Sequence, residues 1–164
     1  LVVLPENISF LIYGIGPDED KLRVLAKELG LEERALFMGQ IGHIDMPLML
    51  KACDIFIRPS RSEGMGNSFV EAFAAGLPVI ATQEGGIADF LFDEKRNPGK
   101  KTTGWAVDVD SPEQIAEAVR DILARPKKVE EVIRHAKELA FTRYDWDLVA
   151  RDMQAVFNEL LEKQ

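Results

Sequence analysis

The sequence predicts an α/β fold in which a doubly wound parallel sheet is followed by terminal helices. Between Ile8 and Val107, short apolar runs rich in β-branched residues alternate with segments of helical periodicity. Parallel strands need such helical crossovers, because the chain must return to the other edge of the sheet before the next strand begins. From Ser111 onward the periodicity is helical only. We therefore expect the sheet first and the additional helices after it.

Glycine and proline divide the apolar runs into separate elements. The first strand breaks at the turn Gly14-Ile15-Gly16-Pro17, and a helix lies between Asp18 and Gly30. The predicted strands are residues 8–13, 35–38, 55–57, 78–81 and 104–107. The other predicted helices are residues 47–52 and 67–75, with a turn and short helix at 85–92. The apolar faces expected to be buried are Leu22, Leu25, Ala26 and Leu29 in the first helix and Val70, Phe73, Ala74 and Leu77 around the third.

Three terminal helices are predicted. The first begins at Ser111-Pro112-Glu113-Gln114, which combines an N-cap, a proline at the first helical position and a capping-box glutamine. Its buried stripe is predicted to be Ile115, Ala118, Val119, Ile122 and Leu123. Residues 127–140 and 146–161 form the other two. Residues 93–103 contain too few apolar side chains to pack, so a mobile surface loop is expected there.

The composition is that of a globular domain with an acidic surface. The 164 residues, 46% hydrophobic and 29% charged, favour a single domain over residues 1–164. A net charge of −8 argues against nucleic acid or an anionic membrane as a general partner. The single cysteine, Cys53, excludes an internal disulfide and favours a cytosolic setting. No His, Cys and Asp set has metal-ligand spacing. The chain lacks an initiator Met and opens on an apolar run, so we expect a piece of a longer protein.

The densest group of candidate functional residues lies between the third strand and the helix that follows it. In a parallel sheet this loop lies at the carboxyl ends of the strands, where ligands bind. Gly64 and Gly66 allow a bound group to approach the backbone closely. Gly66, Asn67 and Ser68 begin a helix, whose free N–H groups and dipole favour an anion such as a phosphate or diphosphate.

Two glutamates flank this helix start. Glu71 lies off the predicted buried stripe, and its carboxylate could accept hydrogen bonds from the vicinal hydroxyls of a ribose. Glu63 lies before the helix, on the side where a transferred sugar would extend. From spacing alone, the alternative stays open that Glu71 only complements the helix dipole and Glu63 is a solvated loop residue.

The ordered set of motifs resembles family 4 glycosyltransferases. Glu63 and Glu71, with seven residues between them, enclose Gly64-Met65-Gly66 and precede the run Ala72 to Ala81. The similarity also includes Phe10 to Tyr13 with Gly14-Ile15-Gly16-Pro17, Phe37-Met38-Gly39, Ala52 to Ile57, Gly85-Gly86 and Gly104 to Val107. It therefore extends over most of the chain.

The resemblance implies a Rossmann-like C-terminal domain of a retaining GT-B enzyme, which binds a UDP-, GDP- or ADP-linked sugar and needs no metal or other cofactor. In that family the position of Glu63 contacts the donor sugar and is the catalytic residue assigned here, while that of Glu71 holds the ribose. The remaining implied donor contacts are the diphosphate at Gly66, Asn67 and Ser68, the base at Gln40 and Ile41, and the glycines Gly64 and Gly16.

The resemblance also implies that parts of the family's usual enzyme are absent from this sequence. Family members carry an arginine and a lysine after the domain's first strand, and an N-terminal domain that builds most of the acceptor site. We therefore expect the isolated chain to have little or no transferase activity, and any contact with the inner membrane face to involve the absent half. The apolar face of the last helix, formed by Leu148, Met153, Val156, Phe157 and Leu160, would then be partly exposed.

Other interpretations stay open. A nucleotide-binding module without catalysis, or a GT-B-fold epimerase or phosphorylase, is compatible with the same fold. Arg58 stands where the family pattern is apolar, and it is either a surface arginine at a strand end or a cation that approaches the phosphates.

Overall fold

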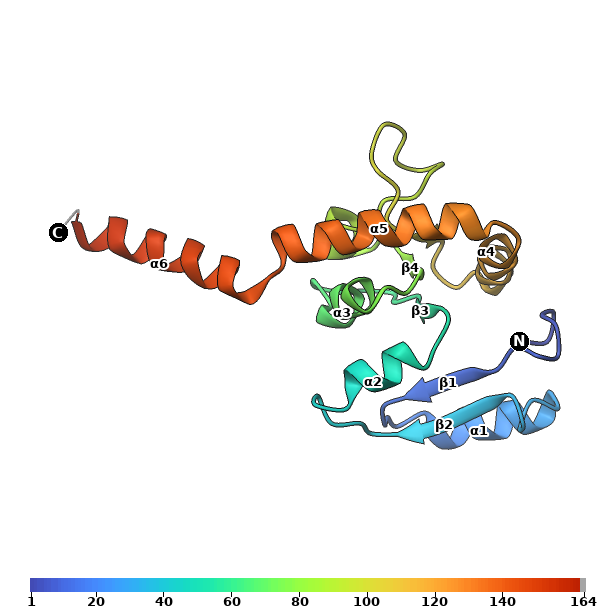
Figure 1. Ribbon diagram of the computed structural model, residues 1–164. Coiled ribbons are helices and arrows are strands. Elements are labelled where there is room, and N and C mark those ends of the chain that lie inside the picture. The colour runs from blue at the N-terminus through green and yellow to red at the C-terminus, as the bar shows by residue number, and fades with distance from the viewer. Residues whose placement is uncertain (163–164) are drawn as a thin grey trace. The chain divides into compact units, whose positions relative to one another are not determined.

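The computed structural model describes residues 1–162 and divides the chain into two compact units. The first unit is Leu1–Met49, and the second begins at Leu50. Each unit has its own parallel sheet, β1-β2 in the first and β3-β4-β5 in the second (Figure 1). The predicted alternation of helices with parallel strands is confirmed. The expectations of one domain over residues 1–164 and of a mobile loop at residues 93–103 stay predictions.

The first unit is a βαβ arrangement. Its strands are β1 (Phe10–Tyr13) and β2 (Ala35–Gly39), joined by helix α1 (Glu19–Glu28). Helix α2 (Met46–Lys51) begins in this unit and ends in the second. Of the apolar face predicted for α1, Ala26 alone is buried, and the three leucines at positions 22, 25 and 29 are each about half exposed. The prediction overestimated their burial, because two short strands offer little surface to cover a whole helix face.

Arg34 fixes the segment that precedes β1. Its Nε donates to the carbonyl oxygen of Ile8 at 2.9 Å, and one Nη donates to that of Pro5 at 2.7 Å. The same Nη lies 3.3 Å from the carbonyl oxygens of Leu1 and Leu4. One guanidinium thus satisfies several carbonyl groups that have no strand partner, as its fork of donors allows.

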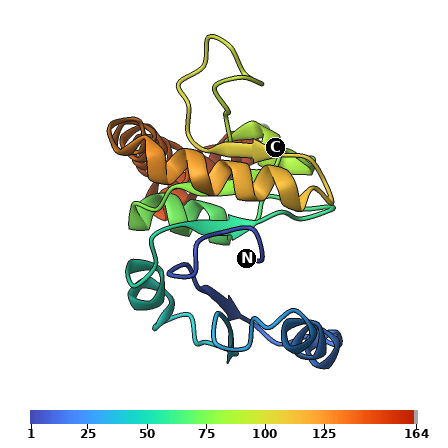
Figure 2. The same cartoon turned by 90° about the vertical axis from the view of Figure 1, so that its right-hand side faces the viewer.

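The second unit contains the larger sheet and most of the helices. Its strands are β3 (Phe56–Arg58), β4 (Val79–Thr82) and β5 (Trp105–Val107), with β4 in the centre. Its helices are α3 (Asn67–Ala75), the 3-10 turn η1 (Gly85–Asp89), α4 (Pro112–Ala124), α5 (Pro126–Arg143) and α6 (Trp146–Glu162). Helix α4 packs beside β5 (Figure 2), and α3 packs against α5. The segment between η1 and β5 forms a loop that rises from this unit in both ribbon views.

The core of the second unit is built around β4 and α3. All four residues of β4 are buried, as expected for the central strand of a covered parallel sheet. Phe69 and Phe73 of α3 are fully buried, and their rings contact that of Phe90 at centroid separations of 5.9 and 6.0 Å. Val70 and Ala74, predicted to be core residues, are only partly buried. Phe73 and Leu77 are buried as predicted. Because α3 packs against α5 as well as β4, its other buried residues are Phe69 and Ala72 rather than Val70 and Ala74.

The start of α4 differs from the predicted capping box. Ser111 makes no side-chain cap, and Gln114 bonds to Asp108 instead. Its Oε1 accepts the Asp108 N–H at 2.8 Å, and its Nε2 donates to the Asp108 carboxylate at 2.7 Å. The link from Gln114 therefore runs to the end of the preceding strand rather than back to the helix N-terminus. Leu123, predicted in the buried stripe, is 58% exposed, whereas the neighbouring Ile122, one residue earlier in the helix and turned to another side, is buried.

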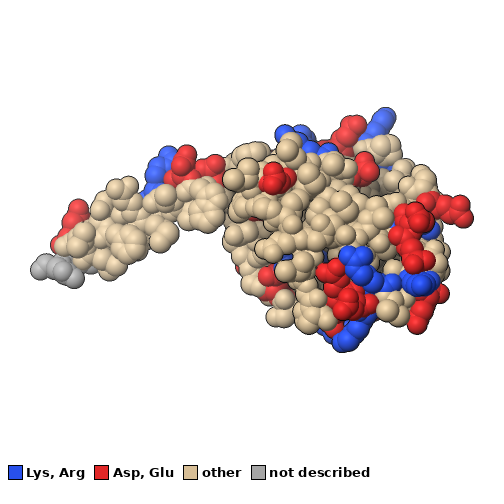
Figure 3. Space-filling model, turned by 90° about the horizontal axis from the view of Figure 1, so that it is seen from below, with Lys and Arg blue, Asp and Glu red and all other residues tan. Residues whose placement is uncertain are grey.

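Helix α6 contains no buried residue among those described. Its exposed apolar side chains include Met153, Val156, Phe157 and Leu160, as predicted, and Trp146 is 76% exposed. Figure 3 shows a largely uncharged surface along this helix. Within residues 1–162, no helix combines the length and apolar character needed to cross a membrane.

Candidate functional site

The loop after β3 is held against the end of β4 by hydrogen bonds. The hydroxyl of Thr82, the last residue of β4, donates to the carbonyl oxygen of Ser60 at 2.6 Å. The N–H of Gly86 donates to the carbonyl oxygen of Glu63 at 3.4 Å. The predicted loop therefore lies at the carboxyl edge of the β3-β4 pair, and its middle contacts η1.

Two glycines of η1 allow this close approach. A Cβ atom at Gly85 would lie 2.0 Å from the carbonyl oxygen of Glu63, and one at Gly86 would lie 2.5 Å from that of Gly64. Real Cβ atoms do not come so near to a backbone oxygen, so any side chain here must displace the loop. Gly85 also has a φ of 59°, in the region that favours glycine. The Gly85-Gly86 motif thus sets the position of the backbone at Glu63.

Gly66 forms the turn from the loop into α3. It has a φ of 65° and precedes the first helical residue, Asn67. A Cβ atom at this position would lie 2.7 Å from the ring of Phe69, so the turn requires a glycine. Asn67 is exposed and Ser68 is partly buried. The N–H groups at this helix start have no acceptor one turn earlier in the helix, which leaves them available to an anion.

The predicted sugar-binding glutamate forms an ion pair with Arg58. An Nη atom of Arg58 lies 2.8 Å from Glu63 Oε2, and the hydroxyl of Ser60 donates to the same oxygen at 3.4 Å. The other Nη of Arg58 donates to the hydroxyl of Ser68 at 2.7 Å. The structure therefore joins Glu63 and Ser68, two predicted site residues, through an arginine whose role the sequence left open. The available indication was its position, the last residue of β3 directly before the loop.

The remaining predicted residues fall into two places. Glu71 lies on α3, partly buried and off the stripe formed by Phe69, Ala72 and Phe73, as predicted. Gly16, Gln40 and Ile41 belong to the first unit, where the turns after β1 and β2 contain them. These turns lie at the same edge of the sheet, because the strands are parallel and the Gly14 N–H donates to the Gly39 carbonyl at 2.8 Å.

Comparison with known proteins identifies the family. The sequence profile of the family described as glycosyl transferases group 1 matches residues 3–139. The chain belongs to this family. It is 28% identical over 156 residues to an uncharacterized glycosyltransferase of Methanocaldococcus jannaschii, which covers 95% of this chain and 38% of the relative. It is 30% identical over 152 residues to the GDP-mannose-dependent alpha-(1-6)-phosphatidylinositol monomannoside mannosyltransferase of Mycobacterium tuberculosis, covering 88% of this chain and 38% of that one.

A solved structure confirms the fold. The crystal structure of the Anabaena protein HepE in complex with UDP superposes with a TM-score of 0.84 at 22% identity, over 96% of this chain and 43% of HepE. The predicted Rossmann-like C-terminal domain of the GT-B fold is thereby confirmed. The chain spans about two fifths of the length of each of these three proteins.

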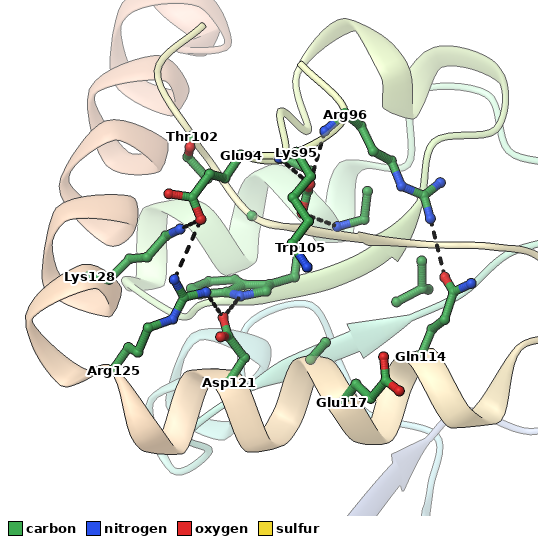
Figure 4. Close-up of a pocket in the computed structure, with 15 residues that line it drawn as sticks. Glu94, Lys95, Arg96, Thr102, Trp105, Gln114, Glu117, Asp121, Arg125 and Lys128 are labelled. Atoms are coloured by element: carbon green, nitrogen blue, oxygen red, sulfur yellow. Dashed lines mark hydrogen bonds and ion pairs between the residues drawn. The ribbon is translucent and has the colours of Figure 1, made fainter. Parts of the chain in front are cut away.

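A pocket lies away from the glutamate loop, which is the segment 59–66 between β3 and α3. It has a volume of about 360 Å³ and is lined by residues 93–96, β5, α4 and the start of α5. Figure 4 shows Glu94 between Arg125 and Lys128, and Arg125 also reaches Asp121. These charges are paired with one another, so the pocket is explained as a structural network that joins the polar loop to α4 and α5. Among residues 1–162, no group of three or more His, Cys, Asp and Glu side chains is arranged to hold a metal.

Asp121 is the acceptor at the centre of this network. Its carboxylate accepts the indole N–H of Trp105 at 2.7 Å as well as the hydrogen bond from Arg125. Burial alone would raise the pKa of the Asp121 carboxyl, but the hydrogen bonds from Arg125 and Trp105 outweigh it and hold the pKa below its usual value. A depressed pKa means that the ionised carboxylate stabilises the fold above the pKa of the unfolded chain, about 3.9.

Replacing Gly86 with alanine is expected to destabilise the second unit. The added Cβ must push the Gly64 backbone away, at a cost of about 1–3 kcal/mol in the free energy of unfolding. Urea denaturation followed by circular dichroism measures the change. Gly64→Ala is the matched control across the same contact, because a Cβ there meets no atom within 4 Å. Equal stabilities of the two variants would show that the contact is not constraining.

Asp121→Asn is expected to lower stability in a pH-dependent way. At pH 7 the loss is about 1 kcal/mol, since the carboxylate is about one-third exposed and solvent weakens its bonds. The difference between wild type and variant should shrink as the pH falls below about 4, where the carboxyl of the unfolded chain takes up a proton and the folded one follows at lower pH. Thermal denaturation from pH 7 to pH 3 tests this. Glu117→Gln, on the same helix, should show no comparable trend.

Proposed function

We propose that this chain is the donor-binding domain of a retaining family 4 glycosyltransferase, which transfers a sugar from a nucleotide diphospho-sugar to an acceptor. The observation that carries the proposal is the loop between β3 and α3, which holds Glu63 next to a glycine-rich helix start in a chain of the glycosyl transferases group 1 family. The nucleotide sugars of relatives support it: one is named for GDP-mannose, and HepE was solved with UDP.

The diphosphate would bind at the start of α3. The backbone N–H groups of Gly66, Asn67 and Ser68 would donate to its oxygens, and the helix dipole favours its negative charge. On the side of Gly64 where a Cβ atom would point, no atom lies within 4 Å, so a ligand has room to approach the backbone there. The donor is a UDP-, GDP- or ADP-linked sugar, and the binding chemistry of these residues uses no metal or other cofactor.

The two glutamates would recognise the two sugars of the donor. Glu71 lies one turn after Asn67, within reach of a ribose next to the diphosphate, and it would accept hydrogen bonds from both ribose hydroxyls. Glu63 would bind hydroxyls of the transferred sugar and position its anomeric carbon. The base would contact the backbone of Gln40 and Ile41, and Gly16 would be a further donor contact.

Transfer with retention would proceed by attack of the acceptor on the face from which the diphosphate leaves. The C–O bond between the anomeric carbon and the diphosphate breaks, the bond to the acceptor oxygen forms, and the leaving diphosphate takes the acceptor's proton. Catalysis needs a positioned acceptor and stabilisation of the leaving charge together. We infer that an acceptor-binding domain completes the site, that this chain alone has little turnover, and that the enzyme works in the cytoplasm, at the inner membrane face if its acceptor is a lipid.

Glu71→Ala is expected to weaken binding of nucleoside diphosphates about tenfold or more, because a charge-assisted pair of hydrogen bonds to the ribose is lost. Calorimetric titration of UDP, GDP and ADP into the chain measures this. Glu113→Ala removes a glutamate from the first turn of another helix and should leave the affinity unchanged. Indistinguishable affinity for wild type and Glu71→Ala would remove Glu71 from the ribose site.

Glu63→Ala is expected to act on turnover more than on nucleotide binding. In an active enzyme that contains this chain, it should lower kcat by about a hundredfold, the range for losing a positioned charged contact. The affinity for the bare nucleoside diphosphate should change much less, since that ligand lacks the transferred sugar. Steady-state kinetics and titration together measure the split, and unchanged kcat would reject the assignment.

A further inference from the structure

Arg58 connects the two halves of the proposed donor site. It ends β3, and its guanidinium donates to Ser68 at the start of α3 while it pairs with Glu63 in the loop. The guanidinium carbon of Arg58, Cζ, lies 5.5 Å from the centre of the Phe69 ring. The ring therefore limits the movement of the guanidinium on one side. An arginine fork thus lies between the residue proposed to bind the sugar and the helix start proposed to bind the diphosphate.

The ion pair of Arg58 is well suited to exchange. The side chain of Arg58 is 46% exposed, and that of Glu63 is 18% exposed. The Arg58 end of the pair is therefore accessible to a ligand, while Glu63 is largely enclosed, so the pair is broken at low cost only if both charges find new partners. A diphosphate presents several charged oxygens to the planar fork and can accept two parallel hydrogen bonds, which one oxygen of Glu63 cannot.

The second arginine of the loop has a different environment. Arg61 pairs with Asp110 at 2.9 Å, and both side chains are largely exposed. It bonds neither to Glu63 nor to the first turn of α3 in any interaction recorded for the described residues. Arg61 is therefore a natural control for the effect of removing a positive charge from this loop.

We propose that Arg58 binds the donor's diphosphate by exchanging its ion pair with Glu63. In the nucleotide-free chain, Arg58 neutralises Glu63 and holds it near Ser68. When a diphosphate binds at the start of α3, the guanidinium moves to the phosphate oxygens and Glu63 is released to bind the sugar. The exchange couples recognition of the diphosphate to the availability of the sugar-binding carboxylate. This inference rests on the proposed function of the loop and assigns Arg58 a role within it.

Titration with nucleoside diphosphate and monophosphate of the same base tests the proposal. UDP, GDP and ADP are first titrated into the wild-type chain to choose the base. Arg58→Met should weaken diphosphate binding about tenfold or more, while monophosphate binding changes about twofold or less. Arg58→Lys should recover part of the loss, since charge remains but the fork is lost. Arg61→Met should bind both ligands as the wild type does.

A double-mutant cycle tests the exchange itself. Glu63→Gln removes the competing charge, so it should tighten diphosphate binding about threefold or more in the wild-type background, because the pair is only partly exposed. The same change should have no effect in the Arg58→Met background. A merely structural role for Arg58 would not make binding tighter when its partner is neutralised. Circular dichroism establishes that each variant is folded. If Arg58→Met does not fold, Arg58→Lys takes its place in the cycle with Glu63→Gln.

The outcomes separate the two proposals. If the wild-type chain binds no nucleoside diphosphate at millimolar concentration, the proposed function of the loop fails. If the wild type binds and Arg58→Met binds equally well, the function stands and the role of Arg58 is overturned. If Glu63→Gln weakens diphosphate binding or acts independently of Arg58, the exchange is overturned.

Discussion

The position of the candidate site depends on a contact between two stretches of backbone. Gly85 and Gly86 lie directly against the carbonyl oxygens of Glu63 and Gly64, with no room for a side chain between them. Because η1 follows the buried central strand β4, the contact transfers the rigidity of the core to an otherwise irregular loop. Loops that carry function need such support, since a ligand is recognised only if its partners are held in place before it arrives.

Phe69 links this loop to both packing and charge. Its ring lies within the aromatic cluster of the second unit, contacts the place where a Cβ of Gly66 would be, and faces the guanidinium of Arg58. The buried side chain of Phe69 therefore requires a glycine at the turn into α3. It also limits the space of the Arg58 guanidinium on one side. The guanidinium of Arg58 is consequently positioned by apolar packing on one side, while its side chain remains about half exposed to a ligand.

Much of the fold could be predicted because its elements follow local rules. Helix α3 has the predicted bounds, since a glycine precedes it and another ends it. The glutamate loop was found through its ordered motif. What could not be predicted depends on contacts between elements or between side chains. The packing of α3 on α5 decides which of its residues are buried. Gln114 bonds to Asp108 rather than to its own helix start, and Arg58 forms an ion pair with Glu63. Periodicity describes one element at a time and says nothing about which charged side chains meet.

The two tryptophans of this chain have opposite surroundings. Trp105 is buried and donates a hydrogen bond to Asp121, whereas Trp146 is exposed to solvent at the start of α6. Both belong to the second unit, and the first unit has none. Selectively excited tryptophan fluorescence therefore has no emitting residue within residues 1–49, where Tyr13 is the one tyrosine. A blue-shifted contribution from Trp105 and a red-shifted one from Trp146 give the second unit two internal reporters, one for its sheet and one for whatever comes to cover its last helix.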